Sequence, residues 1–212
     1  MDFLKNLQNL NNEIQQKKNI KLIVVTKSQD LEKIEPIIQT GHNDFGENRV
    51  IEAKKKWEDI LSFNKGLNLH LIGHLQTNKA KEAVSLFNYI HTLDSEKLAK
   101  ILSTEEKKKD KKIKYFIQVN IGNEVQKTGI ALDQVHTFKE YCFNVLKLNI
   151  IGLMCIPPAG QDPSFFFNKL STLAKEENLS ELSMGMSDDY KIAMQHGATY
   201  LRIGRTIFGE RS

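Results

Sequence analysis

The stretch Leu22-Ile23-Val24-Val25-Thr26-Lys27-Ser28 decides the fold, because in it a β-branched apolar run ends abruptly at a lysine. Such residues favour a β-strand, and a run that does not alternate with polar residues is typical of a strand covered on both faces. Seven similar short runs follow along the chain. Together the eight runs occupy residues 22–26, 43–45, 69–72, 89–92, 115–119, 150–154, 182–184 and 200–203.

Stretches with helical periodicity precede the first run and separate most of the others. The opening segment carries Phe3, Leu7, Leu10 and Ile14 at spacings of four, three and four, which predicts an amphipathic helix. A second stripe consists of Leu132, Val135, Phe138, Cys142 and Val145.

Two later helices carry terminal signals. Asp162 and Pro163 are expected to be the N-cap and first residue of one helix. Ser187-Asp188-Asp189 is expected to cap the next one, with Gly197 just beyond its end.

Short apolar strands that alternate with helices indicate parallel pairing through βαβ units. The eightfold count predicts a single-domain (β/α)8 TIM barrel over residues 1–212, a length near the lower limit for that fold. A doubly wound open sheet is the alternative, because counting strands does not show that the sheet closes.

Composition limits the class of protein. Hydrophobic residues make up 40% of the 212 residues and charged residues 26%, which is ordinary for a globular chain. No apolar run is long enough to span a bilayer, and the opening residues lack the features of a signal peptide. The two cysteines suit a reducing compartment. We therefore expect a cytoplasmic protein without membrane contact.

Neither nucleic acid nor a metal ion is an expected ligand. The net charge of +4 comes mostly from lysines scattered among carboxylates. The densest run, Lys107 to Lys112, has no interleaved aromatic residues and is expected to be a solvated loop. His70 and His74 lie four apart across a predicted strand and turn, so they would not share a helix face. No nucleotide-binding glycine motif occurs in the chain.

In both α/β folds, functional residues follow the carboxyl ends of the strands. Lys27 is in this position, and partial desolvation at the mouth of a barrel would lower its pKa and make its amine a nucleophile for a Schiff base. The alternative is a lysine whose ammonium reaches from the strand end to water.

The loops after the last two strands predict a phosphate site. Ser187, Gly204 and the amide of Arg205 are placed where a phosphate commonly docks in this barrel, although Ser187 could instead be a simple N-cap. A phosphate site opposite a strand-end lysine describes a holder for a phosphorylated aldehyde.

Several motifs, in order from residue 25 to residue 209, resemble those of the YggS/PROSC family of pyridoxal 5′-phosphate (PLP) homeostasis proteins. They are Val25-Thr26-Lys27, Phe45-Gly46-Glu47-Asn48, the block 70–79 (HLIGHLQTNK), the block 118–129 (QVNIGNEVQKTG), Gly152-Leu153-Met154, the block 182–188 (LSMGMSD) and the block 202–209 (RIGRTIFG).

The resemblance implies a PLP-binding barrel similar to the N-terminal domain of alanine racemase. It implies a Schiff base on Lys27, phosphate contacts from Ser187 and the amides of Gly204 and Arg205, and Arg202 facing the pyridine nitrogen. Asn48 and Met184 complete the expected cofactor-binding residues. Position 205 departs from the threonine expected in many relatives, so the guanidinium of Arg205 either replaces that hydroxyl or turns to solvent.

Arg202 favours a carrier over an enzyme. A permanently protonated arginine donates to the pyridine nitrogen without protonating it, which weakens the ring as an electron sink. Racemisation also needs a second base, which a second domain supplies in alanine racemase, and we expect no such domain in this chain. We therefore expect a non-catalytic PLP carrier. The family resemblance implies a monomer, with apo-PLP enzymes as candidate recipients of the cofactor.

Two other functions stay open. One is a weak racemase or lyase that uses His74, Tyr89 or His91 as its second base, although packing at the level of the strands is the favoured interpretation of these residues. The other is a phosphosugar-binding barrel with Lys27 as an aldolase-type Schiff base, which gives Arg202 no task.

Overall fold

Eight parallel strands form a closed barrel in the computed structural model, which describes residues 2–15, 17 and 19–210. Their spatial order is their order in the chain. The strands are β1 (Lys21–Val25), β2 (Asp44–Glu47), β3 (Asn68–Leu71), β4 (Tyr89–Leu93), β5 (Lys114–Gln118), β6 (Asn149–Met154), β7 (Glu181–Ser183) and β8 (Tyr200–Ile203).

The pairing of β1 with β8 closes the barrel. Leu22 lies opposite Leu201 and Ile23 opposite Arg202, while the other edge of β1 pairs with β2. This pairing confirms the predicted (β/α)8 barrel and excludes the open sheet, in which the first and last strands would not meet. The mostly buried strands explain why their sequences do not alternate.

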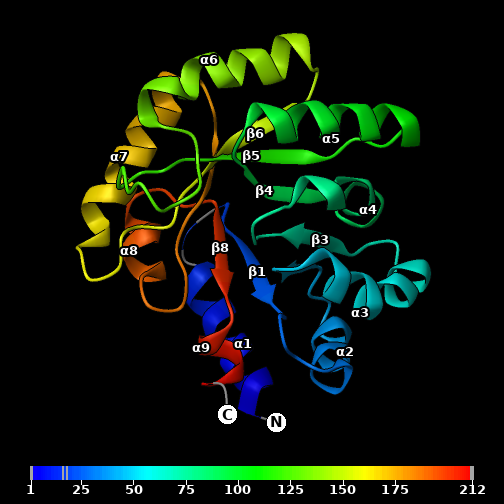
Figure 1. The fold of residues 1–212 in the computed structure, drawn as a ribbon. Coiled ribbons are helices and arrows are strands. Elements are labelled where there is room, and N and C mark those ends of the chain that lie inside the picture. Colours follow the sequence, from blue (N-terminus) through cyan, green and yellow to red (C-terminus); the bar gives the residue numbers. More distant parts are fainter. Residues whose placement is uncertain (1, 16, 18, 211–212) are drawn as a thin grey trace.

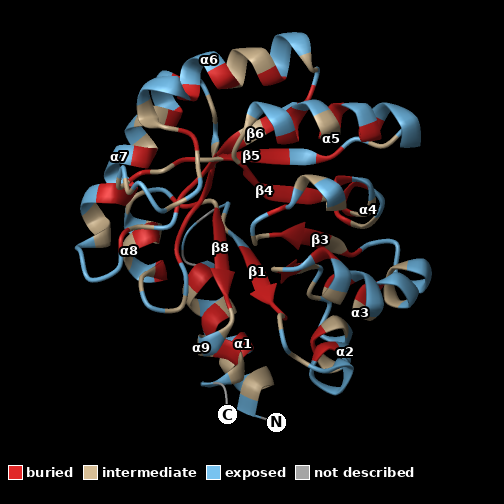
Figure 2. Ribbon diagram, viewed as in Figure 1, coloured by how far each residue is buried: buried red, intermediate tan, exposed pale blue. Residues whose placement is uncertain are grey.

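Helices surround the strands (Figure 1). The α-helices are α1 (Asp2–Gln15), α2 (Leu31–Gln39), α3 (Val50–Phe63), α4 (Ala80–Leu86), α5 (Glu96–Lys109), α6 (Val135–Glu140), α7 (Pro163–Glu176), α8 (Tyr190–Gln195) and α9 (Arg205–Phe208). Two 3-10 helices are η1 (Thr77–Lys79) and η2 (Leu132–Gln134), and η3 (Tyr141–Val145) is a π-helix. Figure 2 shows buried residues along the strands and on the inward faces of the helices.

The core has two parts. One lies inside the barrel and contains Ile23, Tyr89, Phe116, Met154 and Tyr200. The other fills the space between strands and helices, as barrel layering requires. The first and last helices meet, with the rings of Phe3 and Phe208 6.1 Å apart.

Most predicted helix ends are confirmed. The first helix buries Leu7, Leu10 and Ile14, and the carboxylate of Asp162 accepts the Ser164 N–H at 2.9 Å as an N-cap. Gly197, with φ of 87°, follows the C-cap of α8. The stripe beginning at Leu132 is helical but breaks into η2, α6 and η3.

Two boundaries differ from expectation. Residues 187–189 form a turn, and α8 begins only at Tyr190, with Asp189 rather than Ser187 at the N-cap position. The Asp189 carboxylate accepts the N–H of Met186 at 2.6 Å, which stabilises this turn. The lysine run is not wholly a loop, since α5 includes Lys107, Lys108 and Lys109. Asp110 is the C-cap of this helix and has a left-handed backbone conformation.

The described helices include none that is both long and apolar enough to cross a bilayer. Across residues 2–15, 17 and 19–210, histidine, cysteine and acidic side chains nowhere gather in threes in an arrangement suited to a metal ion.

Candidate functional site

A cavity of about 270 Å³ lies at the carboxyl ends of the strands, where barrels carry their functional residues. Its size is just below the range of about 300–1,000 Å³ that is usual for small-molecule sites. The residues that line it are Val25, Lys27, Asn48, Ile72, Ile156, Met186, Ser187, Arg202, Gly204 and Arg205. Six of the seven predicted site residues are thus brought to one cavity.

Lys27 lies two residues beyond the end of β1, in the turn that leads to α2. Thr26 before it is fully buried, whereas Lys27 is half-buried and lines the cavity. The strand therefore carries this side chain to the mouth of the barrel, as its position after an apolar run predicts.

Ser187 and the start of α9 form one wall of the cavity. The Ser187 oxygen accepts a hydrogen bond from the N–H of Thr206 at 3.2 Å, which ties the loop after β7 to the loop after β8. The hydroxyl proton can still be donated to an anion. Gly204 packs on β1, since a Cβ atom there would lie 3.4 Å from the side chain and the carbonyl of Val25.

The guanidinium of Arg205 forms an ion pair with the carboxylate of Asp188 at the rim. Both side chains are largely exposed. Of the two expectations for position 205, this places the guanidinium at the solvent edge, paired with a carboxylate. The loop before α8 and the start of α9 are thereby bridged a second time.

Arg202 is the buried cation of the site, with only 4% of its surface exposed. It donates to the Ser183 hydroxyl at 2.7 Å and to the carbonyl of Cys155 at 3.0 Å. Burial lowers the pKa of Arg202, and Cys155 and Asp189 act in the opposite direction. An arginine held on two sides by the strand ends of β6 and β7 presents a fixed donor to the cavity.

A line of polar contacts runs from Arg202 into the barrel. The Ser183 hydroxyl also contacts His91 Nδ1 at 2.7 Å, and His91 Nε2 lies 3.0 Å from His70 Nδ1. His70 Nε2 in turn contacts Asp44 Oδ1 at 3.0 Å. Because Ser183, His91 and His70 are fully buried, each depends on its neighbours in this line for hydrogen bonds.

Asn48 and Met184 have different surroundings. Asn48 lines the cavity, and its buried Oδ1 atom finds no hydrogen-bond donor among the described residues. Met184 is fully buried in the core between strands and helices and does not line the cavity. Its neighbour in the same motif, Met186, lines the cavity instead.

The residues considered as a second base lie away from the cavity. Tyr89 and His91 pack inside the barrel, where His91 stacks on Phe116 at 4.3 Å between ring centroids. His74 is half exposed and contacts Asp94 Oδ2 at 3.1 Å. None of the three contributes to the cavity lining in the described part of the chain.

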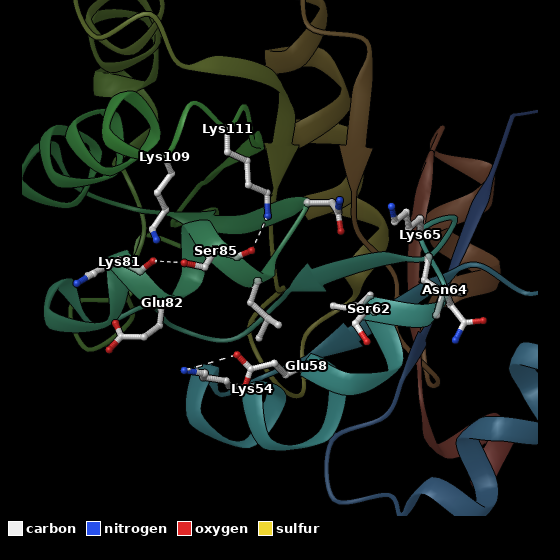
Figure 3. Close-up of a pocket in the computed structure, with 14 residues that line it drawn as sticks. Lys54, Glu58, Ser62, Asn64, Lys65, Lys81, Glu82, Ser85, Lys109 and Lys111 are labelled. Carbon is white, nitrogen blue, oxygen red and sulfur yellow. Dashed lines mark hydrogen bonds and ion pairs between the residues drawn. The ribbon is translucent and has the colours of Figure 1, made fainter.

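A larger cavity of about 720 Å³ lies among α3, α4 and the end of α5 (Figure 3). Leu67 and Asn88, which line it, precede β3 and β4, so this cavity is at the amino ends of the strands. Its five lysines include Lys111, which donates to the carbonyl of Ser85 at 2.9 Å. Burial, with the charge of Lys109, lowers the pKa of Lys111 to about 8.

Sequence reasoning missed the residues that support the site. Ile156 follows β6, so the rule that selected Lys27 would also have found it. Ser183 and His91 lie within strands, where no sequence pattern separates a residue that supports Arg202 from one that packs.

The family described as "Alanine racemase, N-terminal domain" matches residues 2–212 of this sequence. The chain belongs to this family. The family covers all the strands that build the site.

Relatives within the family are similar over nearly their whole length. The pyridoxal phosphate homeostasis protein of Pasteurella multocida is 35% identical, with 96% of this chain and 94% of the relative covered. The protein of the same name from Aquifex aeolicus is 36% identical, with 90% and 87% covered.

A solved structure has the same barrel. PipY of Synechococcus elongatus with PLP bound has a TM-score of 0.89 and 32% identity, covering 98% of this chain and all of PipY. An alanine racemase from Clostridium difficile has a TM-score of 0.77 at 14% identity and shares the fold over 57% of its own length.

Proposed function

We propose that this chain binds PLP in the cavity at the carboxyl ends of its strands, with Lys27 as the covalent attachment residue, and acts in PLP homeostasis. One observation carries the proposal: Lys27, Ser187 and Arg202 meet in a single cavity although they come from the first and the last two strands. PipY with PLP bound, 32% identical over nearly the whole chain, supports the same ligand.

The residues present fit this cofactor. Lys27 and Arg202 bring cationic side chains to the lining, which among the described residues contains no carboxylate, and this charge suits a dianionic phosphate. The orphaned Asn48 oxygen is an acceptor that a ligand can satisfy. When bound, PLP supplies an electrophilic aldehyde carbon and a ring that accepts electrons.

Each side chain has a separate task. Lys27 would supply the amine for a C=N bond to the aldehyde carbon, whose oxygen leaves as water. Ser187 and the loop at Gly204 would hold the phosphate, and Arg202 would donate a hydrogen bond to the ring nitrogen. Arg202 remains protonated while it does so, because an arginine side chain does not lose its proton in a protein. The ring is therefore held without being turned into a strong electron sink.

A carrier role suits this lining better than a catalytic one. In the described part of the chain, the amine of Lys27 is the only group in the cavity with the chemistry of a general base. Incubation of the loaded protein with single amino acids should therefore give no net turnover. Steady racemisation or release of an α-keto acid would contradict the carrier role.

We further propose a cytoplasmic, single-domain monomer that delivers PLP to apo-enzymes. Both cysteines are buried and unbridged, which agrees with a reducing compartment. The names of the relatives support a role in PLP homeostasis.

The visible spectrum tests the proposal. Protein incubated with PLP should show an absorption band distinct from that of free PLP, and Lys27→Ala should lose this band while its far-UV circular dichroism is unchanged. Lys111→Ala is the matched control, because it removes a partly buried lysine from the other end of the barrel and should keep the band. An unchanged band in Lys27→Ala would refute covalent attachment at this residue.

A further inference from the structure

Glu47 is the centre of a buried polar cluster beside the Lys27 turn. It ends β2, and its side chain is fully buried. Its Oε1 atom accepts hydrogen bonds from the Thr26 hydroxyl at 2.7 Å, from Lys56 Nζ at 2.9 Å and from Trp57 Nε1 at 3.0 Å. Three donors on one oxygen fix this carboxylate and join the end of β2 to α3.

The cluster holds both chain neighbours of Lys27. Lys56 Nζ donates to the main-chain carbonyl of Thr26 at 2.8 Å. Glu52 Oε1, which lies 3.4 Å from Lys56 Nζ, accepts the N–H of Ser28 at 2.8 Å. Ser28 has φ of 58°, a left-handed conformation that such a residue keeps only when its surroundings impose it.

Lys56 differs from the other lysines of its helix. Its side chain is only 11% exposed, and its ammonium contacts the oxygens of Thr26, Glu47 and Glu52. Lys54, also on α3, forms its ion pair with Glu58, and both of these side chains are more than half exposed. A lysine that only kept the surface charged would remain exposed, as Lys54 does. The burial of Lys56 therefore indicates a structural task.

We propose that Lys56, together with Glu47 and Glu52, is a positioning residue that fixes the turn of residues 26–28 and so presents Lys27 to the aldehyde of PLP. This inference rests on the proposed function. Lys56 does not line the cavity, so it would act through the main chain on either side of Lys27.

Covalent capture depends on placement more steeply than reversible binding does. A shift of about 1 Å in a reacting group can slow a reaction on the order of 100-fold. The phosphate and the ring would be held by Ser187, Gly204 and Arg202, none of which hydrogen-bonds to Glu47, Glu52 or Lys56. Loss of the cluster should therefore slow capture and leave the affinity for the rest of the cofactor unchanged.

The test separates these two quantities. We compare the rate of covalent PLP capture with the affinity for 4′-deoxypyridoxine 5′-phosphate, which lacks the aldehyde. Lys56→Met should slow capture by about tenfold or more and change the affinity for this analogue by less than about twofold. Lys56→Arg should recover part of the rate, since a guanidinium can donate to the same acceptors. Lys54→Met is the matched control and should behave as the wild type.

Lys56→Met leaves Glu47 buried without its cation and can therefore misfold. A second variant tests the proposal independently of that outcome. Glu52→Ala removes the anchor of Ser28 from the more exposed side of the cluster and should also slow capture. Wild-type capture rates in both variants would overturn the proposal, and so would parallel losses of capture, analogue affinity and thermal stability, which indicate a merely structural role. Absence of capture in the wild type would instead refute the proposed function.

Discussion

Ser183 connects the cation of the site to the interior of the barrel. Its hydroxyl bridges Arg202 and His91, and all three side chains are buried. Ser183→Ala leaves the Nδ1 atom of His91 and one guanidinium nitrogen of Arg202 without their partner in a place that water does not reach, so the free energy of unfolding should fall by about 1–3 kcal/mol. Chemical denaturation measures this change. Ser62→Ala, on the exposed face of α3, should change it by less than about 0.5 kcal/mol, and an equal effect in both variants would contradict the bridge.

The two buried histidines make stability depend on pH. Burial lowers the pKa of His91 well below its usual range, and His70 and Arg202 add to this effect. Burial also lowers the pKa of His70, against the opposing effect of Asp44. In the unfolded chain both titrate near 6.5, so below about pH 6.5 the unfolded state binds protons that the folded state does not.

Acidification should therefore destabilise the fold. The melting temperature should fall as the pH is lowered from about 7.5 to about 5. The free energy of unfolding should decrease over this range by at most about 1.4 kcal/mol per pH unit for each histidine. His91→Gln should flatten this dependence, because it removes one of the two groups that titrate only in the unfolded chain. A melting temperature that is flat over this range would contradict neutral histidines in the core.

At the scale of elements, Gly73 allows the loop after β3 to pack on the loop after β2. A Cβ atom there would lie 2.2 Å from the main-chain oxygen of Asn48, and backbone cannot move aside as a flexible side chain does. Gly73→Ala should lower the free energy of unfolding by about 1–3 kcal/mol and weaken PLP binding by displacing Asn48. Thermal melts and PLP titration measure the two effects.

Gly66→Ala is the control for this substitution. It lies before the same strand, and a Cβ atom there has nothing within 4 Å. Equal PLP affinity in the two variants would show that contact between these loops does not shape the cavity.

Element boundaries show where sequence reasoning reached its limit. Asp162 and Pro163 carry their helix signal locally, so the start of α7 was predictable. Ser187-Asp188-Asp189 looks like a similar signal, but Asp189 bonds back to Met186 and the turn carries Ser187 into the cavity instead. The Ser187 oxygen accepts the N–H of Thr206, which is 19 residues away in the chain, and no local sequence pattern shows that contact.

At the scale of the whole molecule, the number of apolar runs predicts the barrel. Closure of the barrel depends on the pairing of β1 with β8, which are separated by most of the sequence, so no local pattern predicts it. The rule that functional residues follow strands predicts that Lys27, Ser187 and Gly204 lie together, whereas Arg202 lies within β8 and is implied by the family resemblance. Nothing local in the sequence predicts the support beneath them, because Glu47 meets Lys56, and Ser183 meets His91, only through the fold.

Covalent attachment of PLP to Lys27 is the central claim, and reduction of the loaded protein with borohydride followed by peptide mass spectrometry tests it most directly. The account predicts one stable pyridoxyl adduct, on the peptide that contains Lys27. Lys111 is a sensitive competitor, since its pKa of about 8 leaves part of its amine neutral near physiological pH. An adduct on Lys111 or elsewhere, with Lys27 unmodified, would contradict the account.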